Sequence, residues 1–176
     1  LPNPESTAES FRATYVFVGK LFAKLIIDGQ LVDVHFAPYF LRRVLGLPNT
    51  LEQVASFDPA YAESVRRILN SDVAGLDLTF VTTAVVDGKP QDVPLCEDGA
   101  SVAVTEANKV EYVTALLTYR YTTRIEQQAR WFAEGFFALL PRNLVANFSE
   151  QELAMLIAGN DIDLADLHAH VVYERY

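Results

Sequence analysis

The sequence has 176 residues, 51% of them apolar, and its 23 acidic and 14 basic residues leave a net charge of −9. A chain of this length can bury roughly 70% of its unfolded surface in one domain, and its apolar content is too high for a disordered acidic tail. Nucleic-acid binding is excluded as well, because it depends on clustered basic side chains that this sequence lacks. The apolar stretch 16–27 is interrupted by Lys20 and Lys24 and falls short of the roughly 20 residues of a membrane span.

The cysteine and histidine content limits the chemistry open to the chain. Cys96 is its one cysteine, so no internal disulfide can form, and its three histidines are scattered. We therefore expect an intracellular protein without a cofactor, located in the cytoplasm with the nucleus as an alternative. The sequence begins at Leu1 without a methionine or a signal-like segment, which predicts a piece of a longer protein.

The negative charge is unevenly distributed along the chain. Residues 56–112 contain ten acidic and four basic residues, a balance of −6, whereas the remainder carries only −3. This concentration of acidic residues predicts a separate subdomain.

Capping residues and apolar spacing predict four helices before residue 71. Ser6 and Glu9 have the spacing of a capping box at the start of the first helix. The expected helices cover residues 6–28, residues 38–45, one or two turns after Thr50, and residues 59–70 with Asp58 as the cap.

The middle of the chain has the features of β-structure. Apolar and polar residues alternate over 76–80, which predicts a half-buried strand. Short strands are also expected at 93–95 and 102–104, with turns at 87–88 and 98–99.

Helical spacing returns after residue 107. Helices are expected over 108–122 and over 124–140, the second with the widest apolar face in the sequence. A capping box at Ser149 and Glu152 starts a final helix that ends at Gly159. The expected fold is α+β and mainly helical.

The reactive side chains do not form a recognisable catalytic or metal site. Cys96 has no histidine nearby in the sequence to act as its base. His168 and His170 would point to different faces of a helix, and Gly-rich phosphate-binding loops are absent. Three acidic residues lie shortly before these histidines, and their positions are typical of helix caps and first helical turns: Asp161, Asp163 and Asp166. No catalytic residue and no metal ligand is therefore predicted.

A surface that binds another protein is the remaining candidate. Five residues of the acidic segment can line one apolar groove with a carboxylate rim, namely Tyr61, Val65, Leu76, Leu78 and Tyr112. Apolar anchors surrounded by charge suit partner recognition. The alternative interpretation is that these five residues are ordinary core.

Seven motifs in order resemble those of the HECT-type ubiquitin ligases. They are FVGK (17–20), LVDVHF (31–36), FDP (57–59), LDLTF (76–80), VTEANK (104–109), EGF (134–136) and FSEQEL (148–153). The resemblance extends over nearly the whole chain. It implies the N-terminal lobe of a two-lobed domain, with a small inserted helix-plus-hairpin subdomain over 56–115 and a larger helical part formed by 1–55 and 116–176.

The resemblance also implies a function and a set of site residues. In this family the N-terminal lobe docks a ubiquitin-conjugating enzyme, and a C-terminal lobe carries the cysteine that accepts ubiquitin as a thioester. That cysteine is expected outside this sequence, so the chain alone is expected to be inactive and Cys96 has no catalytic role. Protein substrates would be bound by other parts of the parent chain.

The family's groove for the conjugating enzyme corresponds to Tyr61, Val65, Leu76, Leu78 and Tyr112, the same five residues. Phe132 matches one position of a second surface that contacts ubiquitin. Two other classes of protein are weighed against this interpretation: a non-catalytic helical protein-interaction module and a small hydrolase, for which no nucleophile and base were found.

Overall fold

The computed structural model describes residues 7–86 and 88–159. The α-helices are α1 (Arg12–Ile27), α2 (Pro38–Leu45), α3 (Leu51–Phe57), α4 (Pro59–Asn70), α5 (Lys109–Tyr121), α6 (Glu126–Leu139), α7 (Arg142–Val145) and α8 (Glu150–Ala158). The strands are β1 (Val81–Val86) and β2 (Lys89–Pro94), and short 3-10 helices occur at η1 (Glu9–Phe11), η2 (Gly99–Ser101) and η3 (Thr123–Ile125). The α+β, mainly helical class is confirmed.

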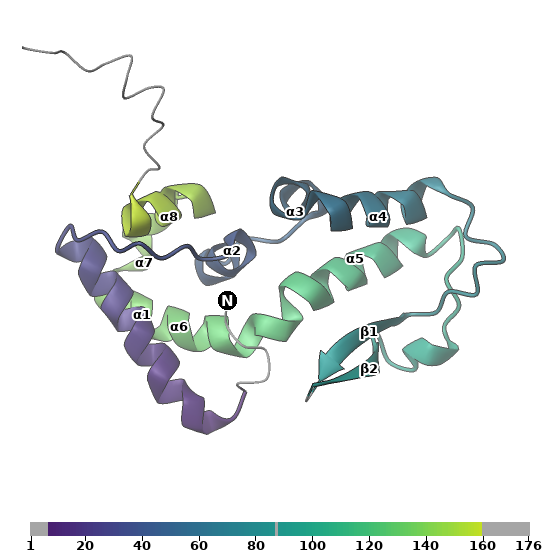
Figure 1. Cartoon of the computed structure of the whole chain (residues 1–176), viewed down its shortest axis with the longest axis horizontal. Coiled ribbons are helices and arrows are strands. Elements are labelled where there is room, and N and C mark those ends of the chain that lie inside the picture. Colours follow the sequence, from purple (N-terminus) through teal and green to yellow (C-terminus); the bar gives the residue numbers. More distant parts are fainter. Residues whose placement is uncertain (1–6, 87, 160–176) are drawn as a thin grey trace, which may run out of the picture.

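The helices form two groups that are joined through α5 and α6. Figure 1 shows α1, α2, α6, α7 and α8 at one end of the molecule and α3, α4, α5 and the β-hairpin at the other. The turn η3 connects α5 to α6 between the two groups. The proposed division into 56–115 and the remainder stays a prediction, and α5 runs across its boundary at residue 116.

Two glycines let α1 and α6 pack backbone to backbone. A Cβ atom on Gly19 would lie 2.1 Å from the carbonyl oxygen of Phe132, and one on Gly135 would lie 1.9 Å from that of Val16. Real Cβ atoms essentially never approach another atom so closely, so only glycine fits at either position. The crossing places Phe22 of α1 next to Phe132 of α6. Both residues belong to the main core cluster of the protein.

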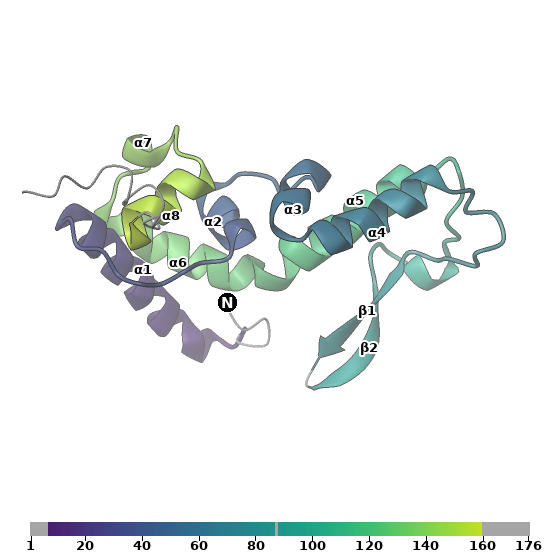
Figure 2. The ribbon, with the colours of Figure 1, turned by 45° about the horizontal axis from the view of Figure 1, so that its top comes forward.

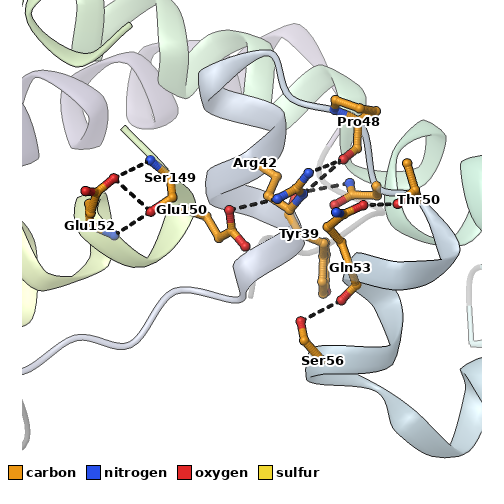
Figure 3. Close-up of polar contacts among 10 residues, drawn as sticks. Tyr39, Arg42, Pro48, Thr50, Gln53, Ser56, Ser149, Glu150 and Glu152 are labelled. Carbon is orange, nitrogen blue, oxygen red and sulfur yellow. Dashed lines mark hydrogen bonds and ion pairs between the residues drawn. The ribbon is translucent and has the colours of Figure 1, made fainter. Parts of the chain in front are cut away.

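A buried ion pair fastens α2 to α8. The guanidinium of Arg42 donates to the Glu150 carboxylate at 2.8 Å, and both side chains are about nine-tenths buried (Figure 3). Arg42 also donates twice to the carbonyl oxygen of Pro48, at 2.7 and 2.9 Å. The neighbouring capping box forms as predicted, with Ser149 and Glu152 each bonded to the other's backbone N–H.

Two smaller clusters hold the second group together. Val54, Val65 and Val113 belong to a cluster that joins α3, α4 and α5. A third cluster lies beyond it, where Tyr112 packs with Phe80 from the segment after α4. The side chain of Ile68 packs against both clusters and so links them.

The expected strand over 76–80 was placed too early in the chain. The strand in this region is β1, which begins at Val81. It pairs antiparallel with β2, from Val81 opposite Pro94 to Val86 opposite Lys89. Residues 76–80 instead pair briefly with the expected 102–104 strand, through one bridge from Thr79 to Ala103. Burial does not follow the apolar–polar alternation, because Leu76 and Asp77 are both exposed and only Phe80 of these five residues is buried, and the pairing is too short for a strand.

The helix predictions agree with the structure apart from details at the ends. Most expected helices recur within a few residues of their predicted bounds, but the first α-helix, expected from residue 6, begins at Arg12 after the 3-10 helix η1, and α7 is an addition that no pattern indicated. Ser6 and Asp87 lie outside the described residues. Thr50 caps no backbone N–H of α3, and its hydroxyl instead contacts the side chain of Gln53 (Figure 3).

Candidate functional site

The five predicted groove residues come from three adjacent parts of the second group. Tyr61 and Val65 lie on α4, Tyr112 lies at the start of α5, and Leu76 and Leu78 lie on the segment that leaves α4. Helices α4 and α5 run side by side in both views (Figures 1 and 2). We call the surface formed by these five residues the α4–α5 face.

Burial divides the five residues into a floor and an accessible part. Val65 is 1% exposed and Tyr112 is 6% exposed, so both are largely core, whereas Leu76 is 53% exposed. Tyr61 and Leu78 are partly buried and pack against the second and third clusters respectively. The residues that a partner could contact directly are therefore Tyr61, Leu76 and Leu78, whereas Val65 and Tyr112 are buried.

The edge of the face at Tyr61 is fixed by a network of polar and aromatic contacts. The Asp58 carboxylate caps α4 by accepting from the Tyr61 backbone N–H at 3.1 Å, and it accepts from the Tyr121 hydroxyl at 2.7 Å. The Arg120 guanidinium lies over the Tyr61 ring, 4.3 Å from its centroid. The rings of Tyr61 and Tyr121 meet edge to face at 5.8 Å.

This network keeps its phenols neutral. Burial raises the pKa of Tyr61, and the nearby charge of Arg120 partly opposes that increase. Burial and the hydrogen bond to Asp58 raise the pKa of Tyr121 far above the usual range for tyrosine. Neither hydroxyl is thus placed to act as a base near neutral pH.

Of the acidic residues in segment 56–112, some are paired and others are exposed at the surface. Glu106 pairs with Lys109 at 2.6 Å and accepts from the Val73 backbone N–H at 2.9 Å, and these contacts lower the pKa of its carboxyl group. Asp77 lies between Leu76 and Leu78 and is exposed. The accessible part of the α4–α5 face therefore has a carboxylate next to its apolar side chains.

Sequence reasoning left out of the site three residues that contact its members or their clusters. Leu116 and Arg120 follow Tyr112 at offsets of four and eight on α5, a spacing that places them on one helical face. Ile68, which packs against both clusters, was also missed. Helical periodicity within α4 and α5 contained the signal for all three residues.

Two hollows in this group lie beside other faces of α5. One has a volume of about 490 Å³ and lies between the start of α3, the end of α4 and α5, with Leu69 and Val110 in its lining. The other, of about 560 Å³, lies between β2 and α5. Neither is lined by any of the five predicted residues.

Phe132 is placed in the core. Its ring is 2% exposed and packs against Phe22, Phe36, Phe40 and Phe136. A role in contacting ubiquitin stays a prediction, and a partner would reach this ring only after local rearrangement.

The described residues contain no catalytic constellation. Cys96 is exposed, and Nδ1 of His35 lies 3.5 Å from the Asp33 carboxylate. Over residues 7–86 and 88–159 no group of three potential ligands could hold a metal, and no helix in these ranges is long and apolar enough to cross a bilayer. The other side chains considered from sequence, Asp161, Asp163, Asp166, His168 and His170, lie outside the described residues.

Comparison with known proteins gives consistent matches over the chain. A family model described as "HECT-domain (ubiquitin-transferase)" matches residues 1–176. E3 ubiquitin-protein ligase HACE1 of Xenopus tropicalis is 36% identical over 176 residues, which cover 98% of this chain and 19% of that protein. E3 ubiquitin-protein ligase UPL1 of Arabidopsis thaliana is 37% identical over 185 residues, covering 99% of this chain and 5% of that protein. The chain thus spans about a fifth or less of the length of these curated relatives.

Proposed function

Because the chain belongs to the HECT-domain family, we propose that it is part of the N-terminal lobe of a ubiquitin ligase and that its α4–α5 face docks a ubiquitin-conjugating enzyme. The observation that supports this proposal most directly is the position of Tyr61, Leu76 and Leu78. They come from separate parts of the sequence and remain at least partly accessible, and Tyr61 and Leu78 pack against the clusters that contain the buried Val65 and Tyr112 respectively.

The proposed contact is small and exchanges rapidly. An apolar side chain from a loop of the conjugating enzyme would pack on Leu76, Leu78 and the Tyr61 ring. Burial of one such side chain contributes roughly 1.5–3 kcal/mol, so the complex would form weakly and dissociate quickly. Rapid release suits an enzyme that must exchange a spent partner for a loaded one.

Acidic side chains of the subdomain would steer the encounter. The balance of −6 over residues 56–112 attracts a partner with a basic surface, and exposed charges are screened by salt. The association rate should therefore fall as the salt concentration rises, while the apolar contacts and hence the dissociation rate change much less.

Ubiquitin transfer itself is assigned to the parent protein. In the proposed mechanism a cysteine in a C-terminal lobe accepts ubiquitin from the docked enzyme and passes it to a substrate lysine. Cys96 is exposed but has no histidine beside it among the described residues, and it takes no part in this proposal. Incubation of the chain with a charged conjugating enzyme should leave Cys96 free of ubiquitin, and a thioester on Cys96 would contradict this assignment.

A matched pair of substitutions tests the docking face. Leu76→Asp introduces a charge at a side chain that is 53% exposed, so it should not unfold the protein. We expect it to lower the affinity for the conjugating enzyme about tenfold or more, because loss of one apolar contact is worth about 1.5 kcal/mol.

The control is Val85→Asp on β1, which is 56% exposed and makes the same change in net charge within the same group of elements. Titration of labelled protein measures both affinities. Equal effects of the two substitutions, or no effect of Leu76→Asp, would refute docking at the α4–α5 face.

A further inference from the structure

The structure places an arginine at the edge of the α4–α5 face that contains Tyr61. Arg120 lies near the end of α5, and its guanidinium carbon is 4.3 Å from the ring centroid of Tyr61 and 5.6 Å from that of Tyr121. Its side chain is 47% exposed. Arg120 is thus a surface residue whose planar group covers one side of the Tyr61 ring.

Arg120 is held in this position by two other side chains. Its Nε–H donates to the Tyr121 hydroxyl at 3.1 Å, and its terminal nitrogen lies 3.8 Å from the Asp58 carboxylate. The Tyr121 hydroxyl donates in turn to the same carboxylate at 2.7 Å. Each side chain in this set therefore restrains another, which limits the rotamers open to the long side chain of Arg120.

Tyr61 is restrained from two directions as a result. The guanidinium covers one face of its ring, while the Tyr121 ring meets it edge to face, with 74° between the planes. At the backbone, Asp58 fixes the first turn of α4 by accepting from the Tyr61 N–H. These contacts restrict the rotamers that are open to the Tyr61 side chain.

Ordering a side chain in advance affects binding. A partner that packs on a mobile aromatic side chain must restrict its rotamers, which costs affinity, whereas a preorganised ring avoids that cost. A guanidinium suits this purpose because it is planar and stacks on an aromatic face while its N–H groups bond in its own plane. The compact ammonium group of lysine cannot do both.

We propose that Arg120 is a positioning residue of the docking face, which holds the Tyr61 ring in the orientation that receives the conjugating enzyme. This inference rests on the proposed docking function. Arg120 acts through Tyr61 and makes no essential contact with the partner. Asp58 and Tyr121 hold Arg120 in place. In this proposal the Asp58 carboxylate has two roles, because it caps α4 and also contacts the Tyr121 hydroxyl and the Arg120 guanidinium.

The first experiment needs no partner. In a chain labelled with ¹³C on its tyrosine rings, Arg120→Met should shift the ring resonances of Tyr61 and broaden them. Arg120→Lys should only partly restore them, because it keeps the charge but loses the stacking. Arg67→Met is the control, since Arg67 lies on the same helix as Tyr61, is 77% exposed and contacts no ring among the described residues. Unchanged Tyr61 resonances in Arg120→Met would overturn the proposal.

The second experiment is a double-mutant cycle with the conjugating enzyme. Arg120→Met should weaken binding about threefold to tenfold, the effect expected when one side chain must be ordered on binding. In a Tyr61→Ala background the same substitution should have almost no effect, because its target is gone. Equal weakening in both backgrounds would show that Arg120 contacts the partner itself and would overturn the positioning role.

The two experiments separate this proposal from the docking function. If Leu76→Asp leaves binding unchanged, docking at this face is refuted, and the Tyr61 resonances still decide whether Arg120 orders the ring. Urea unfolding of Arg120→Met and Arg120→Lys accompanies both experiments, so that a loss of affinity in a poorly folded variant is recognised.

Discussion

Replacement of Gly135 by alanine should destabilise the fold although it improves the helix propensity of α6. The new Cβ would lie 1.9 Å from the carbonyl oxygen of Val16 on α1, and an ordinary contact begins near 3.4 Å. The backbones of α1 and α6 would have to separate by about 1.5 Å, given these two distances. Neither backbone can yield as a flexible side chain would, so the whole crossing must open.

The net effect combines two opposing terms. Alanine favours the helix by about 1 kcal/mol relative to glycine. Overpacking costs about 1–3 kcal/mol, and we expect the upper limit or more because opening the crossing also loosens Phe22 and Phe136 in the main core. The protein should therefore lose about 2 kcal/mol of unfolding free energy, which corresponds to a fall of about 4–8 °C in Tm for a chain of this size.

Thermal and urea unfolding followed by circular dichroism measure this effect. The control is Lys20→Ala, on the exposed side of α1 next to Gly19, which should change stability by less than about 0.5 kcal/mol. Gly19→Ala should behave like Gly135→Ala, because its Cβ would lie 2.1 Å from the Phe132 carbonyl oxygen. A Gly135→Ala protein as stable as the parent would refute the close crossing of the two helices.

Two further substitutions test the attachment and start of α8. Glu150→Ala should cost about 3 kcal/mol in urea unfolding, because it leaves the buried Arg42 charge without its carboxylate, although the two bonds to the Pro48 carbonyl remain. Ser149→Ala should cost about 1 kcal/mol through loss of the cap. Hydrogen bonds from Ser149 lower the pKa of Glu152 below 4.5, so this carboxylate stabilises the protein above the unfolded-state pKa and loses that contribution as the pH falls through the folded-state pKa. Glu152→Gln should accordingly reduce the dependence of the urea midpoint on pH between about pH 3 and neutrality.

Controls for these substitutions come from the same chain. Glu9→Ala breaks an exposed pair with Arg12 and should cost less than about 1 kcal/mol, so a similar cost for Glu150→Ala would contradict the buried pair. If Glu152→Gln leaves the acid dependence of stability unchanged, the capping carboxylate is not its source.

Local signals in the sequence determined most of the helices of this protein. Pro38 and Gly46 bound α2, Asp58 caps α4, and Ser149 with Glu152 starts α8, each where the pattern predicted. These features are local because capping depends on residues three or four positions apart. The family resemblance could also be recognised from the sequence, because it rests on the order of seven motifs and requires no knowledge of the contacts that their residues make.

The strand positions required tertiary structure. Alternation over 76–80 is shared by a true strand and by a segment that is half-buried for other reasons. Phe80 is buried against Tyr112, whereas the hairpin that follows is defined by its backbone pairing and its second strand is largely exposed. The alternation predicted a half-buried strand, yet Leu76 is 53% exposed, and only the fold reveals which backbone segments pair.

The candidate site shows the same division. Sequence grouped Tyr61, Val65, Leu76, Leu78 and Tyr112 but could not separate core from surface, because a buried valine and an accessible leucine have the same pattern. The structure assigns Val65 and Tyr112 to the core and leaves Leu76 open. It also brings Arg120 over Tyr61, 59 positions away in the sequence, through the antiparallel packing of α4 and α5. Contacts of that kind depend on how helices pack, and the sequence alone does not specify them.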